Sequence, residues 1–201
     1  MNNSKSNKRI RFGIIGAGWV ATARYIPVLL RDKRVEVVAI ADHREPDQVA
    51  KRFRIPHYAA DFEELLQFDL DAVVICTPPW QHGPLTMQAI NNGLHVLVEK
   101  PMAMTVVEGE EMVRAARLRG VKFSVAHSFM FSHAMDKSKR ELESGAIGEV
   151  VSVMAVQLSS PERRLPTWYR DLPGGLFYDE SPHMIYLLNY FLGAVDVGYT
   201  R

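Results

Sequence analysis

Two patterns of apolar residues alternate along the first 127 residues of the chain. Short runs rich in Val and Ile, as in strands buried on both faces of a parallel sheet, are separated by longer stretches with helical periodicity. We expect strands at 10–15, 35–41, 57–59, 73–76, 95–98 and 121–126. We expect helices at 19–30, 46–54, from Asp61 onwards, 81–92 and 106–119. This alternation predicts an α/β fold built on a doubly wound parallel sheet.

The pattern changes after His127. A helical stretch at 130–143 is followed by 149–158, where apolar and polar residues alternate as in a half-exposed antiparallel strand, and a last helix ends at Leu192. We therefore divide the chain into a disordered lead-in, a first domain and a second domain, over 1–8, 9–127 and 128–201. One strand and one amphipathic helix cannot bury each other's apolar faces well, so we expect the second domain to be truncated or completed by a partner.

A glycine turn, Gly16-Ala17-Gly18, joins the first strand to the first helix, which opens with Trp19 and Val20. Gly16 permits a tight turn, and Gly18 allows the backbone to approach a pyrophosphate closely. The helix N-terminus supplies N–H groups and a positive dipole end for the anion. Packing of the strand against the helix can also produce such a turn. The neighbouring sequence context must therefore distinguish a pyrophosphate site from a purely structural turn.

That context is the end of the second strand, where Asp42 follows the glycine turn by about twenty residues and precedes His43 and Arg44. A carboxylate at this position accepts the ribose hydroxyls of a nicotinamide dinucleotide. The pattern predicts a dinucleotide site that includes all three residues. Asp42 favours NAD because its charge repels a ribose phosphate, whereas Arg44 leaves NADP open.

Further polar residues follow the next two strands of the predicted sheet. Thr77 and Pro78 come after the fourth strand with His82 close behind, and Glu99 and Lys100 come after the fifth. In an open α/β sheet, ligands bind in the crevice outside the carboxyl ends of the strands, so we expect these residues to belong to the cofactor site. Two interpretations of His82 stay open, a contact to the cofactor and a cap for the helix behind it.

A second polar cluster lies in the predicted second domain, where Gly174-Gly175 precedes Asp179 and His183. The last two residues are four apart and share one helix face if the helix begins early enough. A histidine can take a hydroxyl proton near neutral pH, and a carboxylate can orient it or hold a second hydroxyl. The alternative is a buried structural histidine with Asp179 as a helix cap. Arg170, shortly before the cluster, is a candidate substrate contact.

The composition restricts the classes of partner. With 24 Lys and Arg against 23 Asp and Glu, the net charge of +1 gives no general attraction to nucleic acid or to an anionic membrane. No apolar run is long enough to span a membrane. The single cysteine, Cys76, agrees with a reducing cytoplasm and sits at a strand end where packing is its expected role. We expect no metal, because no other His or Cys stands at ligand spacing from the His183 cluster.

Taken together, these motifs resemble those of the family of glucose–fructose oxidoreductases, inositol dehydrogenases and their MocA-like relatives. The resemblance covers about residues 8–193 and rests on four groups in the family's order: Gly16-Ala17-Gly18-Trp19-Val20-Ala21, Thr77-Pro78-Pro79 with His82, Glu99-Lys100-Pro101, and Gly174-Gly175 with Asp179 and His183. It implies an N-terminal Rossmann domain followed by an α/β domain, here incomplete. An open antiparallel sheet in that second domain would carry the substrate site and usually an oligomer interface, so a complete chain is expected to form a homo-oligomer.

The resemblance also implies roles for three residues. Lys100 would hold and polarise the reacting hydroxyl, Asp179 would bind substrate, and His183 would be the general base. The Lys100–Pro101 bond is expected to be cis, as proline bonds can be at modest cost. The chain departs from the family where an acidic residue often follows the histidine by three positions, because Tyr186 stands there.

These observations predict an NAD(P)-dependent oxidoreductase that transfers a hydride between the nicotinamide and a hydroxyl carbon of a sugar, cyclitol or related polyol. Two other functions stay open. One is a non-catalytic dinucleotide-binding fragment or sensor, and the other is an epimerase or lyase that oxidises its substrate transiently and recycles the cofactor.

Overall fold

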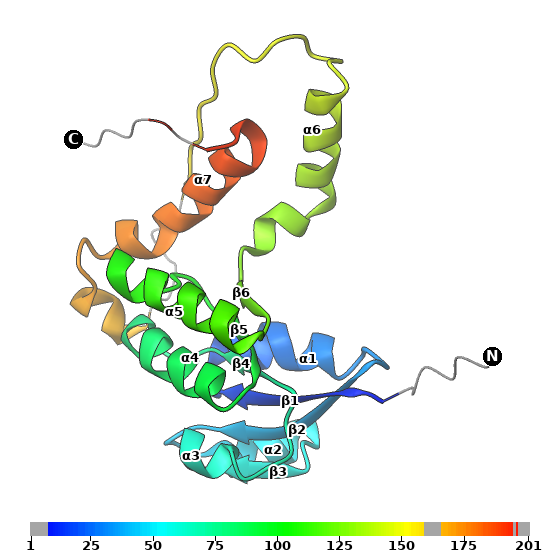
Figure 1. The fold of residues 1–201 in the computed structure, drawn as a ribbon, viewed down its shortest axis with the longest axis vertical. Coiled ribbons are helices and arrows are strands. Elements are labelled where there is room, and N and C mark those ends of the chain that lie inside the picture. The colour runs from blue at the N-terminus through cyan, green and yellow to red at the C-terminus, as the bar shows by residue number, and fades with distance from the viewer. Residues whose placement is uncertain (1–7, 159–165, 195, 197–201) are drawn as a thin grey trace, which may run out of the picture. The chain divides into compact units, whose positions relative to one another are not determined.

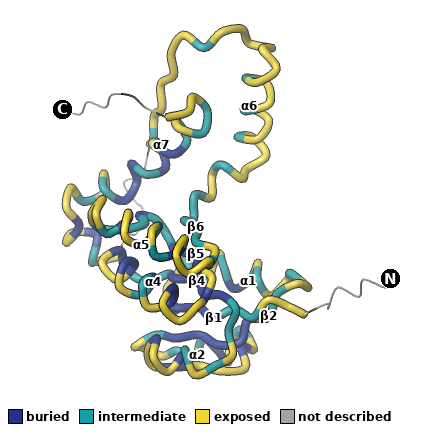
Figure 2. The backbone as a smooth tube through the Cα atoms, viewed as in Figure 1, coloured by how far each residue is buried: buried dark blue, intermediate teal, exposed yellow. Residues whose placement is uncertain are grey.

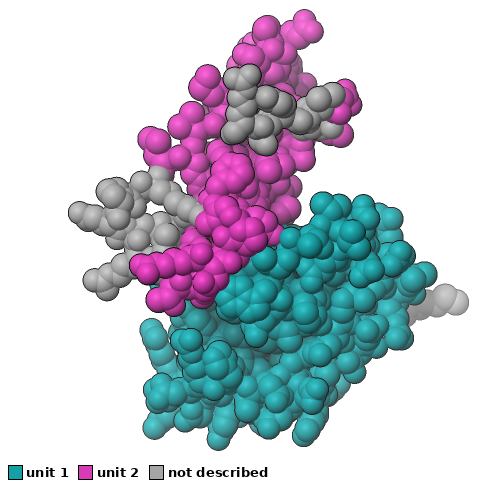
Figure 3. Space-filling model, turned by 90° about the vertical axis from the view of Figure 1, so that its left-hand side faces the viewer, with its two compact units in different colours: residues 1–126 teal, residues 127–201 magenta. Residues whose placement is uncertain are grey.

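The computed structural model describes residues 8–158, 166–194 and 196. The chain forms two compact units, Met1–Ala126 and His127–Arg201, which Figure 3 shows in different colours. We call them the first and the second unit and describe each by itself.

The first unit is built on one six-stranded sheet (Figure 1). Its strands are β1 (Ile10–Ile15), β2 (Val35–Ala41), β3 (His57–Ala59), β4 (Ala72–Ile75), β5 (His95–Val98) and β6 (Phe123–Val125). They are parallel throughout and lie in the order β3-β2-β1-β4-β5-β6. The chain therefore winds outward from β1 in one direction and from β4 in the other, which confirms the predicted doubly wound sheet. The change of direction between β1 and β4 is the place where such sheets bind ligands.

The helices of the first unit follow the predicted alternation. They are the π turn η1 (Ala21–Tyr25), α1 (Ile26–Leu29), α2 (Pro46–Phe53), α3 (Phe62–Leu65), the 3₁₀ turn η2 (Pro79–Gln81), α4 (His82–Asn91) and α5 (Val106–Arg119). Side-chain caps set two of the starts: Asp61 accepts a hydrogen bond from the backbone N–H of Glu64, and Thr105 from that of Glu108. The helix expected at 19–30 begins at Trp19, as predicted, but contains a π turn that the sequence pattern did not indicate.

The sheet separates two apolar cores, because successive side chains of a strand point to opposite faces. Ile14 of β1 packs in a core with Ile26 of α1 and Ala50 of α2, whereas its neighbour Ile15 packs in a core with Ile90 of α4. Figure 2 shows the strands as the most deeply buried part of this unit. Burial on both faces explains why the strand sequences read as continuous apolar runs.

The second unit contains only helical elements among its described residues, 127–158, 166–194 and 196. They are the 3₁₀ turns η3 (Ser128–Phe131) and η4 (Thr167–Asp171) and the helices α6 (His133–Glu143) and α7 (Leu176–Leu192). The helix expected from residue 130 begins later because Ser132 caps it, with its hydroxyl accepting the backbone N–H of Met135.

The strand predicted at 149–158 is not present: residues 150–158 have no regular secondary structure. Their apolar side chains are largely exposed, with Val151 at 94% and Leu158 at 90%. A strand needs a neighbour for its backbone N–H and C=O groups, and no described residue of this unit supplies one. The alternating pattern is typical of a strand, but no described residue of this unit pairs with residues 150–158.

The glycine turn gives a test of the fold. Gly16 has a φ of +93°, and a Cβ placed on it would lie 2.7 Å from the carbonyl oxygen of Cys76, whereas a Cβ on Gly18 meets nothing within 4 Å. We expect Gly16→Ala to lower the free energy of unfolding by about 3 kcal/mol, through backbone strain and the clash. Gly18→Ala, the matched control, should change it by less than about 0.5 kcal/mol. Urea unfolding of both variants followed by circular dichroism would test this, and equal stabilities would contradict it.

Candidate functional site

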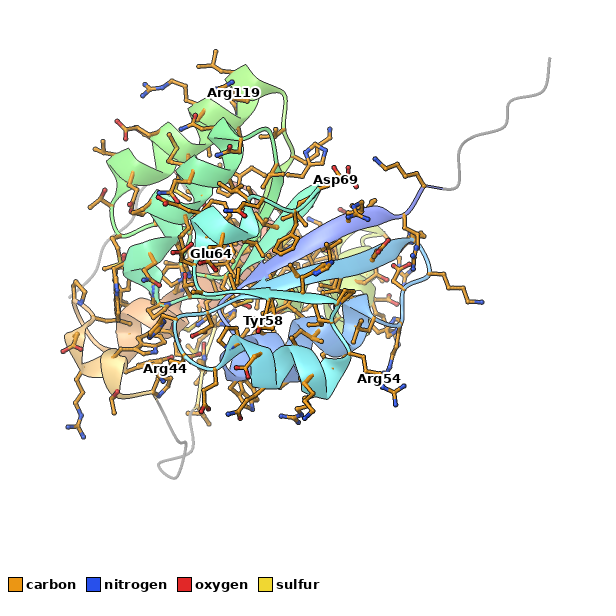
Figure 4. The ribbon with its side chains drawn as sticks, turned by 90° about the horizontal axis from the view of Figure 1, so that it is seen from below. Arg44, Arg54, Tyr58, Glu64, Asp69 and Arg119 are labelled. Atoms are coloured by element: carbon orange, nitrogen blue, oxygen red, sulfur yellow. The ribbon has the colours of Figure 1, made fainter. Side chains whose placement is uncertain are left out.

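The residues predicted to bind a dinucleotide lie at one edge of the first unit. They follow the carboxyl ends of β1, β2, β4 and β5, which are neighbours in the parallel sheet and so end on the same side. Arg44, which follows β2, lies at this edge in Figure 4, whereas Arg54, which precedes β3, lies at the opposite one. Four separate stretches of sequence therefore meet where the strand order changes direction.

The glycine turn packs closely against the strands on both sides of β1. The N–H of Gly16 donates to the carbonyl of Ala41 at the end of β2 (2.8 Å), and its α-carbon faces the carbonyl of Cys76 after β4. Gly18 lies one step further on, with open space where a side chain would stand. The helix that starts at Trp19 follows directly, and the first N–H groups of a helix have no partner inside it. The turn thus offers an open backbone surface suited to an anion.

Asp42 connects this turn to the end of β2. One carboxylate oxygen accepts the N–H of Ala17 (2.7 Å), and the other accepts the N–H of Arg44 (2.9 Å). The imidazole of His43 lies 3.4 Å from the carboxylate and is 79% exposed. The Asp42 side chain is 15% exposed, so part of it faces solvent beside the turn. A carboxylate has about four lone-pair positions, and two backbone donors leave it able to accept ribose hydroxyls.

Thr77 supplies an independent sign that this edge fits a polar ligand. Its hydroxyl oxygen is buried and has no hydrogen-bond partner among the described residues. The residue follows β4, and its backbone nitrogen would lie 3.0 Å from a Cβ on Gly16. A buried polar atom without a partner is uncommon and needs an explanation. Together with the glycine turn and Asp42, it fits a cofactor that brings its own polar groups, as a dinucleotide does.

Glu99 and Lys100 follow β5 at the same edge, and the Lys100–Pro101 bond is cis, as the resemblance implied. One Glu99 oxygen accepts the hydroxyl of Tyr25 (2.6 Å), and the other accepts the N–H of Lys100 (3.1 Å). Burial and the carboxylate of Glu99 raise the pKa of Tyr25, so the phenol stays protonated and remains a donor. Tyr25 lies in the π turn behind the glycine turn, so this contact joins the predicted pyrophosphate loop to the segment that carries Lys100.

His82 braces the same region from the start of α4. Its ring is almost completely buried, with Nδ1 2.7 Å from the carbonyl of Pro101 and Nε2 2.9 Å from that of Thr77. Burial lowers the pKa of the imidazole, and a neutral ring donates to only one of the two carbonyls at a time. Neither nitrogen is left to meet a cofactor. His82 is also not the cap of α4, which is Gln81, and its ring instead supports the segments after β4 and β5.

In the second unit, α7 carries both Asp179 and His183, because the helix begins at Leu176, early enough to include them. Asp179 is 3% exposed and accepts a hydrogen bond from the hydroxyl of Tyr169 in η4. Asp179 is therefore an interior helix residue bound to a phenol and not the helix cap, which is Gly175. Arg170, the predicted substrate contact, is exposed beside the buried Tyr169.

His183 lies among aromatic side chains of its own unit and is 8% exposed. Its Nδ1 is 2.8 Å from the hydroxyl oxygen of Tyr186, one turn further along α7. The ring of Phe129 stacks on the imidazole with centroids 4.4 Å apart, and the ring of His127 stacks on Tyr186 at 4.2 Å. Tyr186 thus takes the place beside the histidine where the family often has an acidic residue.

Sequence reasoning missed three contacts. The spacing of Tyr186 and His183 on one helix face could have indicated their pairing. The contacts Tyr25–Glu99 and Tyr169–Asp179 join residues far apart along the chain or on separate elements, and the periodicity of the sequence does not predict them. Within the described part of the chain, no three His, Cys, Asp or Glu side chains are arranged to hold a metal ion. Nor does any helix there have the length and apolarity needed to cross a membrane.

Comparisons with known proteins agree with this geometry. Residues 10–127 match the model of an oxidoreductase family, NAD-binding Rossmann fold (GFO_IDH_MocA). Residues 139–201 match the C-terminal α/β domain of the same family. "Oxidoreductase P35" of Formosa agariphila is 32% identical over 200 residues, which are 94% of this chain and 62% of that protein.

Two solved structures are similar as well. A 3-ketoreductase from Actinomadura kijaniata in complex with TDP-benzene and NADP superposes with a TM-score of 0.84 at 30% identity, over 93% of this chain and 58% of the other. GenD2 from gentamicin A biosynthesis in complex with NAD gives a TM-score of 0.79 at 25% identity, over 92% of this chain and 54% of the other. The chain thus spans a little over half the length of these proteins.

The contact between Tyr25 and Glu99 can be tested by removing one hydroxyl. We expect Tyr25→Phe to lower the free energy of unfolding by about 1–3 kcal/mol, because a partly buried carboxylate oxygen loses its donor. The matched control is Tyr58→Phe. Tyr58, labelled in Figure 4, is 59% exposed, so this variant should change the free energy of unfolding by less than about 0.5 kcal/mol. Urea unfolding at neutral pH measures both. A Tyr25→Phe variant as stable as the control would show that the contact contributes little.

Proposed function

The chain belongs to the Gfo/Idh/MocA oxidoreductase family, and on that premise we propose that the protein transfers a hydride between a nicotinamide dinucleotide and a carbon that bears a hydroxyl or keto group in a sugar, cyclitol or related polyol. A dinucleotide bound at the sheet edge would supply or accept the hydride. One observation carries the proposal: Lys100 follows β5 at the same edge of the sheet as the glycine turn, Asp42 and the unpaired hydroxyl of Thr77. A lysine at that edge would lie beside the bound cofactor and could polarise the reacting oxygen.

The other residues of the first unit have supporting roles in this proposal. Gly16, Ala17 and Gly18 would hold the pyrophosphate, with Trp19 and Val20 at the helix start, and Asp42 would hold a ribose. His43, Arg44 and Pro78 would border the cofactor. Glu99 would keep the Lys100 backbone in place through its own N–H contact. His82 would act only through the carbonyls that it contacts.

In the second unit, Asp179 and His183 are proposed to handle the substrate. Both are buried on one face of α7, and each has an aromatic hydroxyl as partner. A carboxylate can accept hydrogen bonds from substrate hydroxyls, which is the role proposed for Asp179. His183 would exchange a proton with the reacting oxygen. Arg170, exposed next to Tyr169, is retained as a contact for a polar part of the substrate.

Two other functions differ from the proposed hydride transfer in what they require of these residues. A redox-cycling epimerase or lyase would use the same first steps and differ only in the fate of the oxidised substrate. A non-catalytic dinucleotide binder would need the glycine turn and Asp42 but not Lys100. The single cysteine, which is partly buried, supports a reducing compartment such as the cytoplasm.

Lys100→Ala separates an enzyme from a binder. Affinity for NAD and NADP is measured by isothermal titration, and turnover by the absorbance of reduced nicotinamide with a panel of sugars and cyclitols. We expect the variant to bind the cofactor with unchanged affinity and to lose turnover by a factor of about 10² or more, because it lacks the group that polarises the reacting oxygen. The control Lys51→Ala, at an exposed position of α2, should behave like the parent chain. Turnover retained in Lys100→Ala would overturn the proposed role.

The cofactor preference follows from the charge of Asp42, and we expect the chain to bind NAD more tightly than NADP. Asp42→Asn keeps an acceptor for the N–H of Ala17 but removes the charge that repels a 2′-phosphate. The variant should therefore shift the affinity ratio toward NADP by about tenfold, or about 1.4 kcal/mol. Isothermal titration of both chains with both cofactors measures the ratio. A parent chain that already prefers NADP would contradict the assignment.

A further inference from the structure

The hydrogen bonds of Tyr186 determine which ring nitrogen of His183 carries a hydrogen, and so whether His183 gives or takes a proton. The hydroxyl oxygen of Tyr186 accepts the backbone N–H of Phe129 at 3.2 Å. A backbone N–H can only donate, so at this contact the oxygen must use a lone pair. The hydroxyl oxygen also lies 2.8 Å from Nδ1 of His183. The remaining question is which of these two atoms carries the hydrogen between them.

Relative basicity answers that question. Imidazole, whose conjugate acid has an ordinary pKa of about 6.5, is a far stronger acceptor than a phenol, which gives up its proton only near about pH 10. The arrangement O–H···N is therefore favoured over N–H···O, and it agrees with a phenol oxygen that already accepts from Phe129. The neutral ring has one hydrogen, so accepting at Nδ1 places that hydrogen on Nε2.

We propose that Tyr186 is a positioning residue that holds His183 as the Nε2–H tautomer, so that the resting site presents a proton to the substrate oxygen and is set up for a ketone that is reduced. This inference rests on the proposed function. A carboxylate in the place of Tyr186 would do the opposite, because it accepts from Nδ1–H and leaves Nε2 as a base.

The proton inventory of the reduction balances. A reduced nicotinamide would supply the hydride that forms the new C–H bond at the carbonyl carbon, and the electron pair of the C=O π bond would move to the oxygen to give an alkoxide. The alkoxide oxygen takes the Nε2 proton of His183, while Nδ1 takes the phenol proton of Tyr186. The imidazole stays neutral, and the phenolate left on Tyr186 keeps its hydrogen bond from the Phe129 N–H until solvent returns a proton.

Two described ionisable groups near the pair, His127 and Asp179, are compatible with this arrangement. From the segment before η3, His127 stacks on Tyr186, and burial lowers its pKa, so that it remains neutral at pH 7. From α7 itself, Asp179 stands four residues before His183 and takes a hydrogen bond from Tyr169. The Phe129 ring stacked on the imidazole is not ionisable and limits its rotation. The contacts within this unit thus favour one orientation of the His183 ring.

The tautomer can be measured without any substrate. ¹⁵N-labelled chain is studied by long-range ¹H–¹⁵N correlation at pH 8, and His183 is assigned by comparison with His183→Asn. We expect the spectrum to show a proton on Nε2 and an unprotonated Nδ1. In Tyr186→Phe, which keeps the ring but loses the hydroxyl, the Nε2–H preference should fall. Tyr190→Phe, on the same helix, is the control and should leave it unchanged. A proton on Nδ1 in the parent chain would overturn the proposal.

The pH profile of the reduction gives a second readout. Reduced cofactor is supplied with 2-keto-myo-inositol, dihydroxyacetone and a 3-keto sugar, and kcat/KM is followed for the ketone that reacts fastest. With Tyr186 as the source of the proton, the rate should hold through neutral pH and decline only toward about pH 10. Tyr186→Phe should move this decline to about pH 6.5, where a histidine alone loses its proton.

The results distinguish a failure of the Tyr186–His183 proton relay from a failure of the proposed hydride transfer. A parent profile that already declines near about pH 6.5 would overturn the relay. If the chain binds neither NAD nor NADP, the proposed hydride transfer is refuted, whereas the tautomer of His183 is still decided by the spectrum.

Discussion

The close packing of Gly16 against the carbonyl of Cys76 is the contact on which the first unit depends. It fixes the chain where β1 leaves the sheet, between the ends of β2 and β4, with φ in the left-handed region where a side chain is strained. Because the turn is held there, Asp42 reaches the N–H of Ala17, and Thr77 comes to lie beside the turn. The geometry of this edge of the sheet thus follows from one position that has room only for a hydrogen atom.

The sheet could be predicted from sequence because its strands are buried on both faces. Runs such as 73–76 have no polar residue to obscure the pattern, and Asp61 and Gly120 mark a helix start and a helix end by their own chemistry. The π turn at Ala21–Tyr25 could not be predicted, because it shifts the hydrogen bonds by one residue without changing which side chains are apolar. The strand expected at 149–158 failed for a different reason. Alternation describes the faces of a strand, whereas its formation depends on a neighbour that lies elsewhere.

The candidate site was predictable where position along a strand decides the matter. Residues directly after parallel strands must meet at one edge, so the order of the strands along the chain was enough to group Asp42, Thr77 and Lys100. The partners of these residues could not be predicted in this way. Tyr25 contacts Glu99 across 74 positions of sequence, and His82 contacts two backbone carbonyls that carry no sequence signal. The sequence thus indicated the candidate site residues, whereas their hydrogen-bond partners became known only from the structure.

Three buried ionisable groups of α7 each have at least one neutral partner. Asp179 is paired with the phenol of Tyr169, Glu180 with the amide of Gln157, and His183 with the phenol of Tyr186. A neutral donor satisfies a buried group without cancelling its charge. The partner of His183 also differs from a carboxylate in what it can give, because a phenol has a proton to donate and a carboxylate has none. The exchange of an acidic residue for Tyr186 therefore changes the chemistry available to the histidine while leaving its place on the helix unchanged.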